Sequence, residues 1–154
     1  MVAPMAQLLD IAIRRDPDSG IFDLAIDGRD LAWDRTPATP MILALGTDRW
    51  AKPDDILPDG TRAADSREFG ARRGWPGDAV TGGRVGSRLW LLSRAKQMET
   101  TRLRAIAYAD EALERLRRRG VAVSVEATWA RRGLLSLTAR ADATALTIGQ
   151  AVAA

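Results

Sequence analysis

The sequence contains neither cysteine nor histidine. Without cysteine the chain cannot form a disulfide, and without histidine it lacks the commonest general base and the commonest transition-metal ligand. Nucleophile pairs of the serine–histidine and cysteine–histidine kinds are therefore excluded. An enzyme built on this sequence would have to use carboxylates, lysine, serine, threonine or tyrosine.

Long apolar runs are missing as well. No stretch of 18 or more apolar residues occurs, and the first sixteen residues have neither the basic segment nor the apolar core of a signal peptide. We therefore expect a protein that is made and folded in the cytoplasm and has no membrane partner. A length of 154 residues predicts a single domain, 1–154, with a modest core.

The charge balance is close to neutral. The 23 basic residues, almost all arginine, exceed the 20 acidic residues by only three, which is too little to predict a nucleic-acid partner. Five tryptophans outnumber one tyrosine and two phenylalanines. Such large amphipathic rings suit cores and protein interfaces about equally, and we expect two or three of the five to be buried.

The first half of the chain divides into three segments. Alternating apolar residues and intervening turns predict an N-terminal β-meander over residues 8–34. A short helix is predicted from about Pro40 to Trp50, with Thr39 as its cap. Residues 52–85 contain three of the seven prolines and six of the thirteen glycines, which indicates a long loop.

Residues 86–120 carry the longest helical signal. Ser87 can cap a first helical piece, and Thr100 or Thr101 can cap a second piece or simply continue into it. The second piece has a one-sided apolar stripe made of Leu103, Ile106, Ala109, Leu113 and Leu116. Its exposed side offers two acid-before-base pairs four residues apart, Glu111–Arg115 and Glu114–Arg118.

The end of this helix and the hairpin that follows are clearly marked. Gly120 can adopt the left-handed conformation that ends a helix. Residues 121–129 then alternate strictly, a turn follows at 130–133, and a second strand returns over 135–139. We predict an α+β protein whose core, 86–140, is a long helix packed on a C-terminal antiparallel β-hairpin sheet. The tail, 141–154, is either an extra strand or an extended arm.

Few residues offer chemistry. Asp110, Glu111 and Glu114 could supply the acid and base of a glycosidase, but salt bridges on a solvated helix face explain their spacing better. Arg117, Arg118 and Arg119 could contact phosphates, but a helix end that attracts cations explains them better. We expect no metal, no cofactor and no small-molecule substrate.

Trp75 stands out within the long loop. It lies among arginines, glycines and a proline, in Arg72-Arg73-Gly74-Trp75-Pro76-Gly77-Asp78. A tryptophan in such a setting is typical of an interface anchor, and a plug over the core is an almost equal alternative.

Four blocks in order resemble the baseplate protein family of Mu-like contractile-tailed phages. They are Leu45–Ala51, Asp55–Gly60, Arg72–Asp78 and Gly86–Leu92, continued by Glu111–Leu113 and by the hairpin turn at 131–133. The resemblance covers about residues 9–140 and extends more broadly to T4-type baseplate wedge and sheath-initiator proteins and their type VI secretion counterparts. The wider family has an acid-proline-arginine signature before the first hairpin strand. Here that place reads Leu116-Arg117-Arg118-Arg119-Gly120, in which only Arg119 can stand for the signature.

The resemblance implies a non-enzymatic structural protein of the virion tail baseplate, assembled in the host cytoplasm. Its implied partners are other baseplate wedge subunits and the tail sheath or tube proteins, with a sheet edge in the hairpin 121–140 as template for the sheath. A carboxylate-dependent peptidoglycan hydrolase of the tail tip and a small nucleic-acid-binding module are the alternatives. The candidate interface residues are Arg72, Arg73, Trp75, Asp78, Arg88, Arg117, Arg118, Arg119, Val121, Val123, Arg131 and Arg132.

Overall fold

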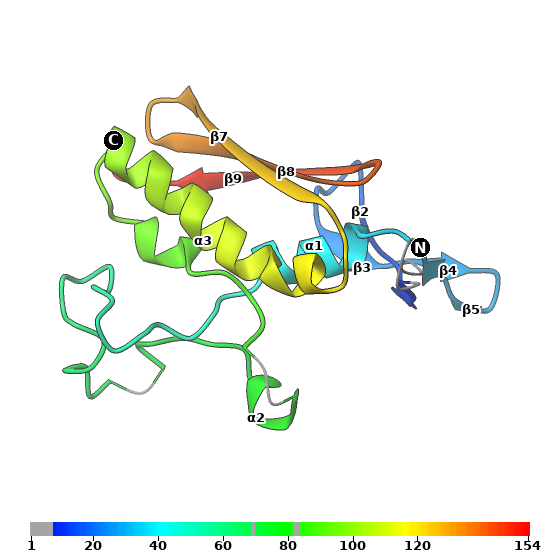
Figure 1. Ribbon diagram of the computed structural model, residues 1–154, viewed down its shortest axis with the longest axis horizontal. Helices are drawn as coiled ribbons and strands as arrows, with labels where there is room; N and C mark the ends of the chain where they lie inside the picture. The colour runs from blue at the N-terminus through cyan, green and yellow to red at the C-terminus, as the bar shows by residue number, and fades with distance from the viewer. Residues whose placement is uncertain (1–7, 69, 82–83) are drawn as a thin grey trace.

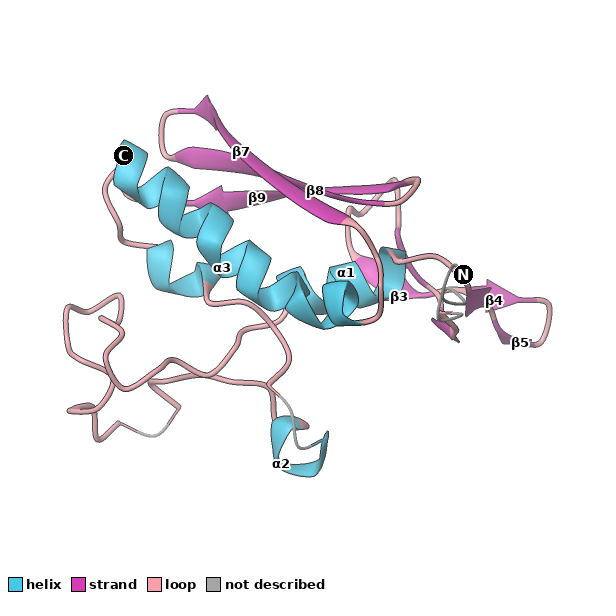
Figure 2. Cartoon of the chain, viewed as in Figure 1, coloured by secondary structure: helices cyan, strands magenta, loops and turns pink. Residues whose placement is uncertain are grey.

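A computed structural model describes residues 8–68, 70–81 and 84–154. A long helix, α3 (Glu99–Arg118), crosses one face of a three-stranded antiparallel sheet (Figure 1). A short helix, α1 (Ala38–Gly46), also packs against α3. The long loop lies on the side of α3 away from the sheet, and the N-terminal strands project from one end (Figure 2). The predicted α+β class and the helix-on-sheet core are confirmed.

The sheet consists of β7 (Val123–Arg131), β8 (Leu134–Ala141) and β9 (Thr144–Ala151), with β8 in the centre. The inward residues of β8 are fully buried, and its outward residues, mostly polar, are partly or fully exposed, because successive side chains of a strand point to opposite faces. The C-terminal tail therefore forms the extra strand rather than an extended arm. No helix in the described ranges is long and apolar enough to cross a membrane.

Helix α3 buries a stripe slightly different from the predicted one. Ala109, Leu113 and Leu116 are buried as expected, but Leu103 is 52% exposed, and Ala105 and Tyr108 complete the stripe instead. The N-cap is Met98, with no side-chain cap, so the predicted threonine caps are wrong. The Thr101 hydroxyl instead donates to the Lys96 carbonyl at 2.7 Å. Gly120 is left-handed (φ +82°), as expected for the residue that ends a helix.

Residues 86–98 do not extend this helix. A single 3₁₀ turn, η1 (Leu89–Leu92), buries all four of its residues and is followed by a break before α3. Ser87 does not cap it. Its amide donates to the Thr47 carbonyl at 2.9 Å and its carbonyl accepts from Arg49 at 2.8 Å, which joins η1 to the end of α1.

The N-terminal strands pair as three short antiparallel ladders rather than as one three-stranded sheet. The pairs are β1 (Asp10–Ile11) with β6 (Trp33–Asp34), β2 (Ile13–Arg15) with β3 (Phe22–Leu24), and β4 (Ile26–Asp27) with β5 (Asp30–Leu31). They meet where Ala12, Ala25 and Ala32 exchange backbone hydrogen bonds of 2.8–2.9 Å. We call residues 8–34 the N-terminal arm.

Helix α1 begins earlier than predicted. Its N-cap is Pro37 rather than Thr39, and the Asp34 carboxylate accepts from the amides of Thr36 and Thr39 at 2.8 and 3.0 Å, which satisfies an amide of the first turn. The long loop contains one further short helix, α2 (Asp78–Thr81). All five tryptophans lie in the described part of the chain, and only Trp90 is buried there, fewer than the two or three expected.

Candidate protein interface

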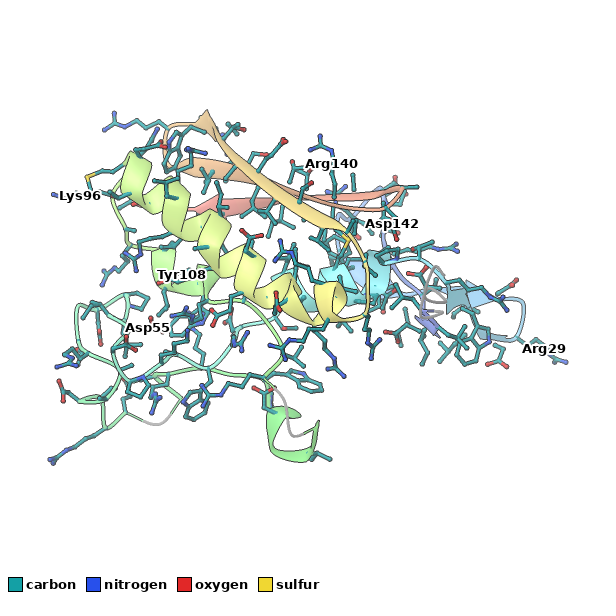
Figure 3. All side chains as sticks on the ribbon, viewed as in Figure 1. Arg29, Asp55, Lys96, Tyr108, Arg140 and Asp142 are labelled. Carbon is teal, nitrogen blue, oxygen red and sulfur yellow. The ribbon has the colours of Figure 1, made fainter. Side chains whose placement is uncertain are left out.

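Arg88 is the residue that fastens the long loop to helix α3. It precedes η1 and is only 9% exposed. Its guanidinium forms ion pairs of 2.6 Å with Asp55 in the loop and 2.7 Å with Glu111 on α3. It also lies over the ring of Tyr108, 4.5 Å from the ring centre. Figure 3 shows Asp55 on the loop, on the same side of α3 as Tyr108.

Lys52 completes this cluster. Its ammonium lies 2.9 Å from the Glu111 carboxylate, and its amide donates to Asp55 at 2.7 Å. Glu111 therefore faces the loop and does not pair with Arg115 as predicted, because the buried Arg88 and the partly exposed Lys52 offer two cations on that side. The predicted pair Glu114–Arg118 is confirmed at 3.4 Å.

The cluster also bears on the hydrolase alternative. Burial by itself would raise the pKa of Glu111, but hydrogen bonds from Lys52 and Arg88 outweigh burial, and the pKa is lowered. A glycosidase general acid needs a raised pKa so that it is protonated at the working pH. The geometry around Glu111 therefore favours a structural role for this carboxylate.

Two of the predicted interface arginines stack on tryptophans within the chain. Arg72 lies 5.2 Å from the ring centre of Trp50 and donates to the Ala51 carbonyl at 2.8 Å. Arg73 lies 4.7 Å from the ring centre of Trp90 and pairs with Asp48 at 2.6 Å. Both arginines hold the loop against the segment after α1, because each makes a cation–π contact and a hydrogen bond or ion pair with the rest of the chain.

Trp75 is 39% exposed and forms one wall of a pocket of about 270 Å³. Three arginines, Arg84, Arg115 and Arg119, also line this pocket. We call it the arginine-rimmed pocket; its other lining residues are Asp10, Pro40, Leu43, Ala44, Thr47, Val85, Gly86, Ala112 and Leu116. Trp75 thus shares the pocket lining with the core residue Leu116 and is also accessible to a partner.

The remaining predicted interface residues do not form one continuous surface. Asp78 closes the loop by accepting from the Val85 amide at 2.8 Å. Arg117 pairs with Asp110 and donates to the Val123 carbonyl at 3.4 Å. Val121 is buried, as Arg88 is, so both are unavailable to a partner on this surface.

Three of the other predicted interface residues belong to the sheet or to its β7–β8 turn, and Arg118 lies on α3. Val123 faces the core from the start of β7, and Arg131 and Arg132 are exposed at the turn between β7 and β8. Arg118 is exposed beside Glu114. Of the twelve predicted interface residues, Trp75 and Arg119 line one pocket, and Arg117 and Arg118 line another, more polar hollow along α3.

Sequence reasoning missed most of that site. Leu43 and Ala44 fall within the helix predicted from about Pro40 to Trp50, for which no surface role is predicted, and Arg115 is predicted to pair with Glu111. The signal that could have found the pocket is the apolar side of α1 that remains after its core residues, Met41 and Leu45, are accounted for.

Comparison with known proteins places the chain in a family. A family model described as phage protein GP46 matches residues 37–147, which leaves the N-terminal arm outside. Baseplate protein gp46 of Escherichia phage Mu is 42% identical over 121 residues, which cover 77% of this chain and 78% of that protein. The Mu-like prophage FluMu protein gp46 of Haemophilus influenzae is 49% identical over 55 residues, 35% of this chain and 41% of that protein. The chain therefore belongs to the GP46 family of phage proteins, the Mu-like baseplate family that its sequence blocks resemble.

Proposed function

We propose that this protein is a structural component of a contractile phage tail baseplate, located in the virion and acting through protein contacts. It binds a larger wedge subunit and provides a sheet edge on which the first sheath subunits assemble. The name of the Mu relative supports the baseplate role. The open three-stranded sheet is the observation that supports the template role.

The two edges of this sheet are not equivalent. On β7, the outward carbonyls of Val123 and Ala127 already accept from Arg117 and Arg102 of α3, at 3.4 and 3.1 Å. An incoming strand would have to displace these guanidinium groups. The β7 edge of the hairpin 121–140 is therefore partly satisfied within the chain.

Strand β9 offers the more open edge. The two-residue turn after Ala141 makes Ala141 and Thr144 the hydrogen-bonded pair that closes this hairpin. Along an antiparallel ladder, hydrogen-bonded pairs alternate with pairs whose backbone groups point away from the partner strand. The backbone groups of Ala145, Thr147 and Gly149 consequently point away from β8. No backbone hydrogen bond from another described segment reaches these three residues. Unpaired groups of this kind bind an added strand, so β9 is the edge we propose for the sheath.

A wedge subunit would then bind elsewhere. The long loop lies on the opposite side of α3 from the sheet (Figure 1). The Arg88 cluster fixes this loop, so the loop presents a preformed surface. We propose that the wedge partner binds the loop, which leaves the sheet accessible to the sheath.

The experiment is co-expression with the neighbouring late-operon products, followed by mass measurement of any complex and electron microscopy of sheathed tails. Thr147→Pro removes one outward N–H of β9, and Thr147→Ala, the matched control, removes only the side chain. We expect normal wedge complexes with both variants and loss of sheathed tails with Thr147→Pro alone. Sheathed tails in normal numbers with a folded Thr147→Pro would refute the β9 template. A wild-type chain that joins no complex would refute the baseplate role.

A further inference from the structure

The tip of the N-terminal arm exposes apolar side chains that nothing in the described chain covers. Ile26 on β4 and Leu31 on β5 are direct cross-strand partners, so they share one face of the tip. Ile26 is 74% exposed and Leu31 38%. An isolated two-stranded hairpin is marginally stable in water, so this tip gains stability from any partner that covers it.

The other face of the same tip is acidic. Asp27 and Asp30 lie directly opposite each other, and like charges in such positions destabilise a strand pair. The arm as a whole carries seven aspartates against three arginines, a net charge of −4 in a chain whose total is +3. A cationic partner would relieve the repulsion at the tip.

The arginine-rimmed pocket has the complementary composition. Its walls include Leu43, Trp75 and Leu116, and Arg84, Arg115 and Arg119 line its rim. None of these three arginines forms an ion pair with a carboxylate of the described residues. A dry cavity of about 150 Å³ can hold benzene, so about 270 Å³ has room for a branched aliphatic side chain.

The tip cannot satisfy the pocket of its own chain in this structure. Asp10, near the base of the arm, lines the pocket, whereas no residue from Ile26 to Leu31 does. Figure 3 shows Arg29, between the two tip strands, at the far end of the arm and away from α3. The tip and the pocket are therefore separate surfaces of one molecule.

We propose that the arm tip of one copy docks into the arginine-rimmed pocket of a second copy. Ile26 or Leu31 enters the apolar part, and the carboxylates of Asp27 and Asp30 pair with the rim arginines. Because the tip and the pocket are different surfaces, the contact between two copies is heterologous. Repeated contacts of this kind form a closed ring or an open filament, depending on the rotation that relates one copy to the next. The inference rests only on surfaces of this chain and stands apart from the baseplate role.

The test uses the purified full-length chain in sedimentation velocity over a range of protein concentrations. We expect reversible self-association that weakens as salt increases, because exposed charge pairs are screened. Asp27→Lys with Asp30→Lys, or Arg115→Glu with Arg119→Glu, should each weaken association at least about tenfold. Arg131→Glu with Arg132→Glu, the same charge change at the β7–β8 turn, is the matched control and should associate as the wild type does.

Mixing the two reversed variants gives the decisive result. The aspartate tip of one then meets the intact arginines of the other, and the lysine tip meets the glutamates, so association should return in the mixture alone. Circular dichroism checks that each variant is folded. A wild-type chain that stays monomeric at its highest soluble concentration, or self-association that all three variants leave unchanged, overturns the inference.

Discussion

Replacing Arg88 with methionine tests the contact that attaches the long loop to α3. The change removes two ion pairs of 2.6 and 2.7 Å and the contact with Tyr108, and it leaves the largely buried carboxylates of Asp55 (10% exposed) and Glu111 (25% exposed) without their shared cation. Breaking a buried pair by removing one partner costs about 3–5 kcal/mol. Glu111 keeps Lys52 and is one-quarter exposed, so we expect the lower end, about 3 kcal/mol.

The assay is urea unfolding followed by tryptophan fluorescence. With a slope of about 2 kcal/mol per molar urea, the midpoint should fall by about 1.5 M. Arg118→Met is the matched control, because Arg118 also pairs with a glutamate on α3 but its side chain is 77% exposed. An exposed pair contributes at most about 1 kcal/mol. Equal losses for the two variants would refute the importance we assign to the cluster.

The pH dependence adds a second criterion. The pKa of Glu111 is lowered in the folded protein, so its ion pairs stabilise the fold above the unfolded pKa and are lost as pH falls through the folded pKa. In Arg88→Met, Glu111 keeps only Lys52 as an ion-pair partner, so less electrostatic stabilisation remains to be lost on acidification. The difference in unfolding free energy between wild type and Arg88→Met should therefore shrink from pH 7 towards pH 4. A difference that stays constant with pH would contradict the electrostatic explanation.

Two paired substitutions test the packing. Gly86→Ala should lower the unfolding free energy by about 1–3 kcal/mol, because Gly86 is left-handed (φ +97°) and an added Cβ would lie 2.6 Å from the Thr47 carbonyl oxygen. Gly46→Ala is the matched control: its added Cβ meets nothing within 4 Å, so it should be neutral or slightly stabilising. Thermal unfolding of the two variants measures the difference. Leu113→Ala should cost about 2–5 kcal/mol at a fully buried site, whereas Leu103→Ala, at a half-exposed site, should cost far less in urea unfolding; similar costs would contradict the observed α3 stripe.

The sequence predicted those parts of the fold that local patterns determine. The strict alternation after Gly120 gave the hairpin, and the three-and-four spacing gave α3. The error at Leu103 has a tertiary cause, because the sheet and the loop cover the sides of α3 that carry Ala105 and Tyr108 and leave Leu103 exposed. Spacing alone does not distinguish a small buried residue from a large exposed one when both fit the helical period.

The ladders of the arm were beyond local patterns for a similar reason. Residues 8–34 alternate as strands do, but three alanines, at 12, 25 and 32, divide the segment at a common junction. Only small side chains allow backbones to approach closely at such a point. Alternation reports which residues are extended and not which strand each one pairs with.

The arginines show where sequence reasoning about the candidate site reaches its limit. Arg88 and Arg119 have the same chemistry and both flank a helical segment, yet Arg88 is buried and Arg119 is exposed at the pocket rim. The difference is set by which carboxylates the fold brings near: Asp55 and Glu111 converge on Arg88 from the loop and α3, and no carboxylate in the described ranges forms an ion pair with Arg119. An arginine paired within its own chain is committed to the fold, and the unpaired ones remain available to bind an acidic surface. The arm supplies such a surface, so the distribution of ion pairs, rather than the number of arginines, indicates where this chain makes contacts.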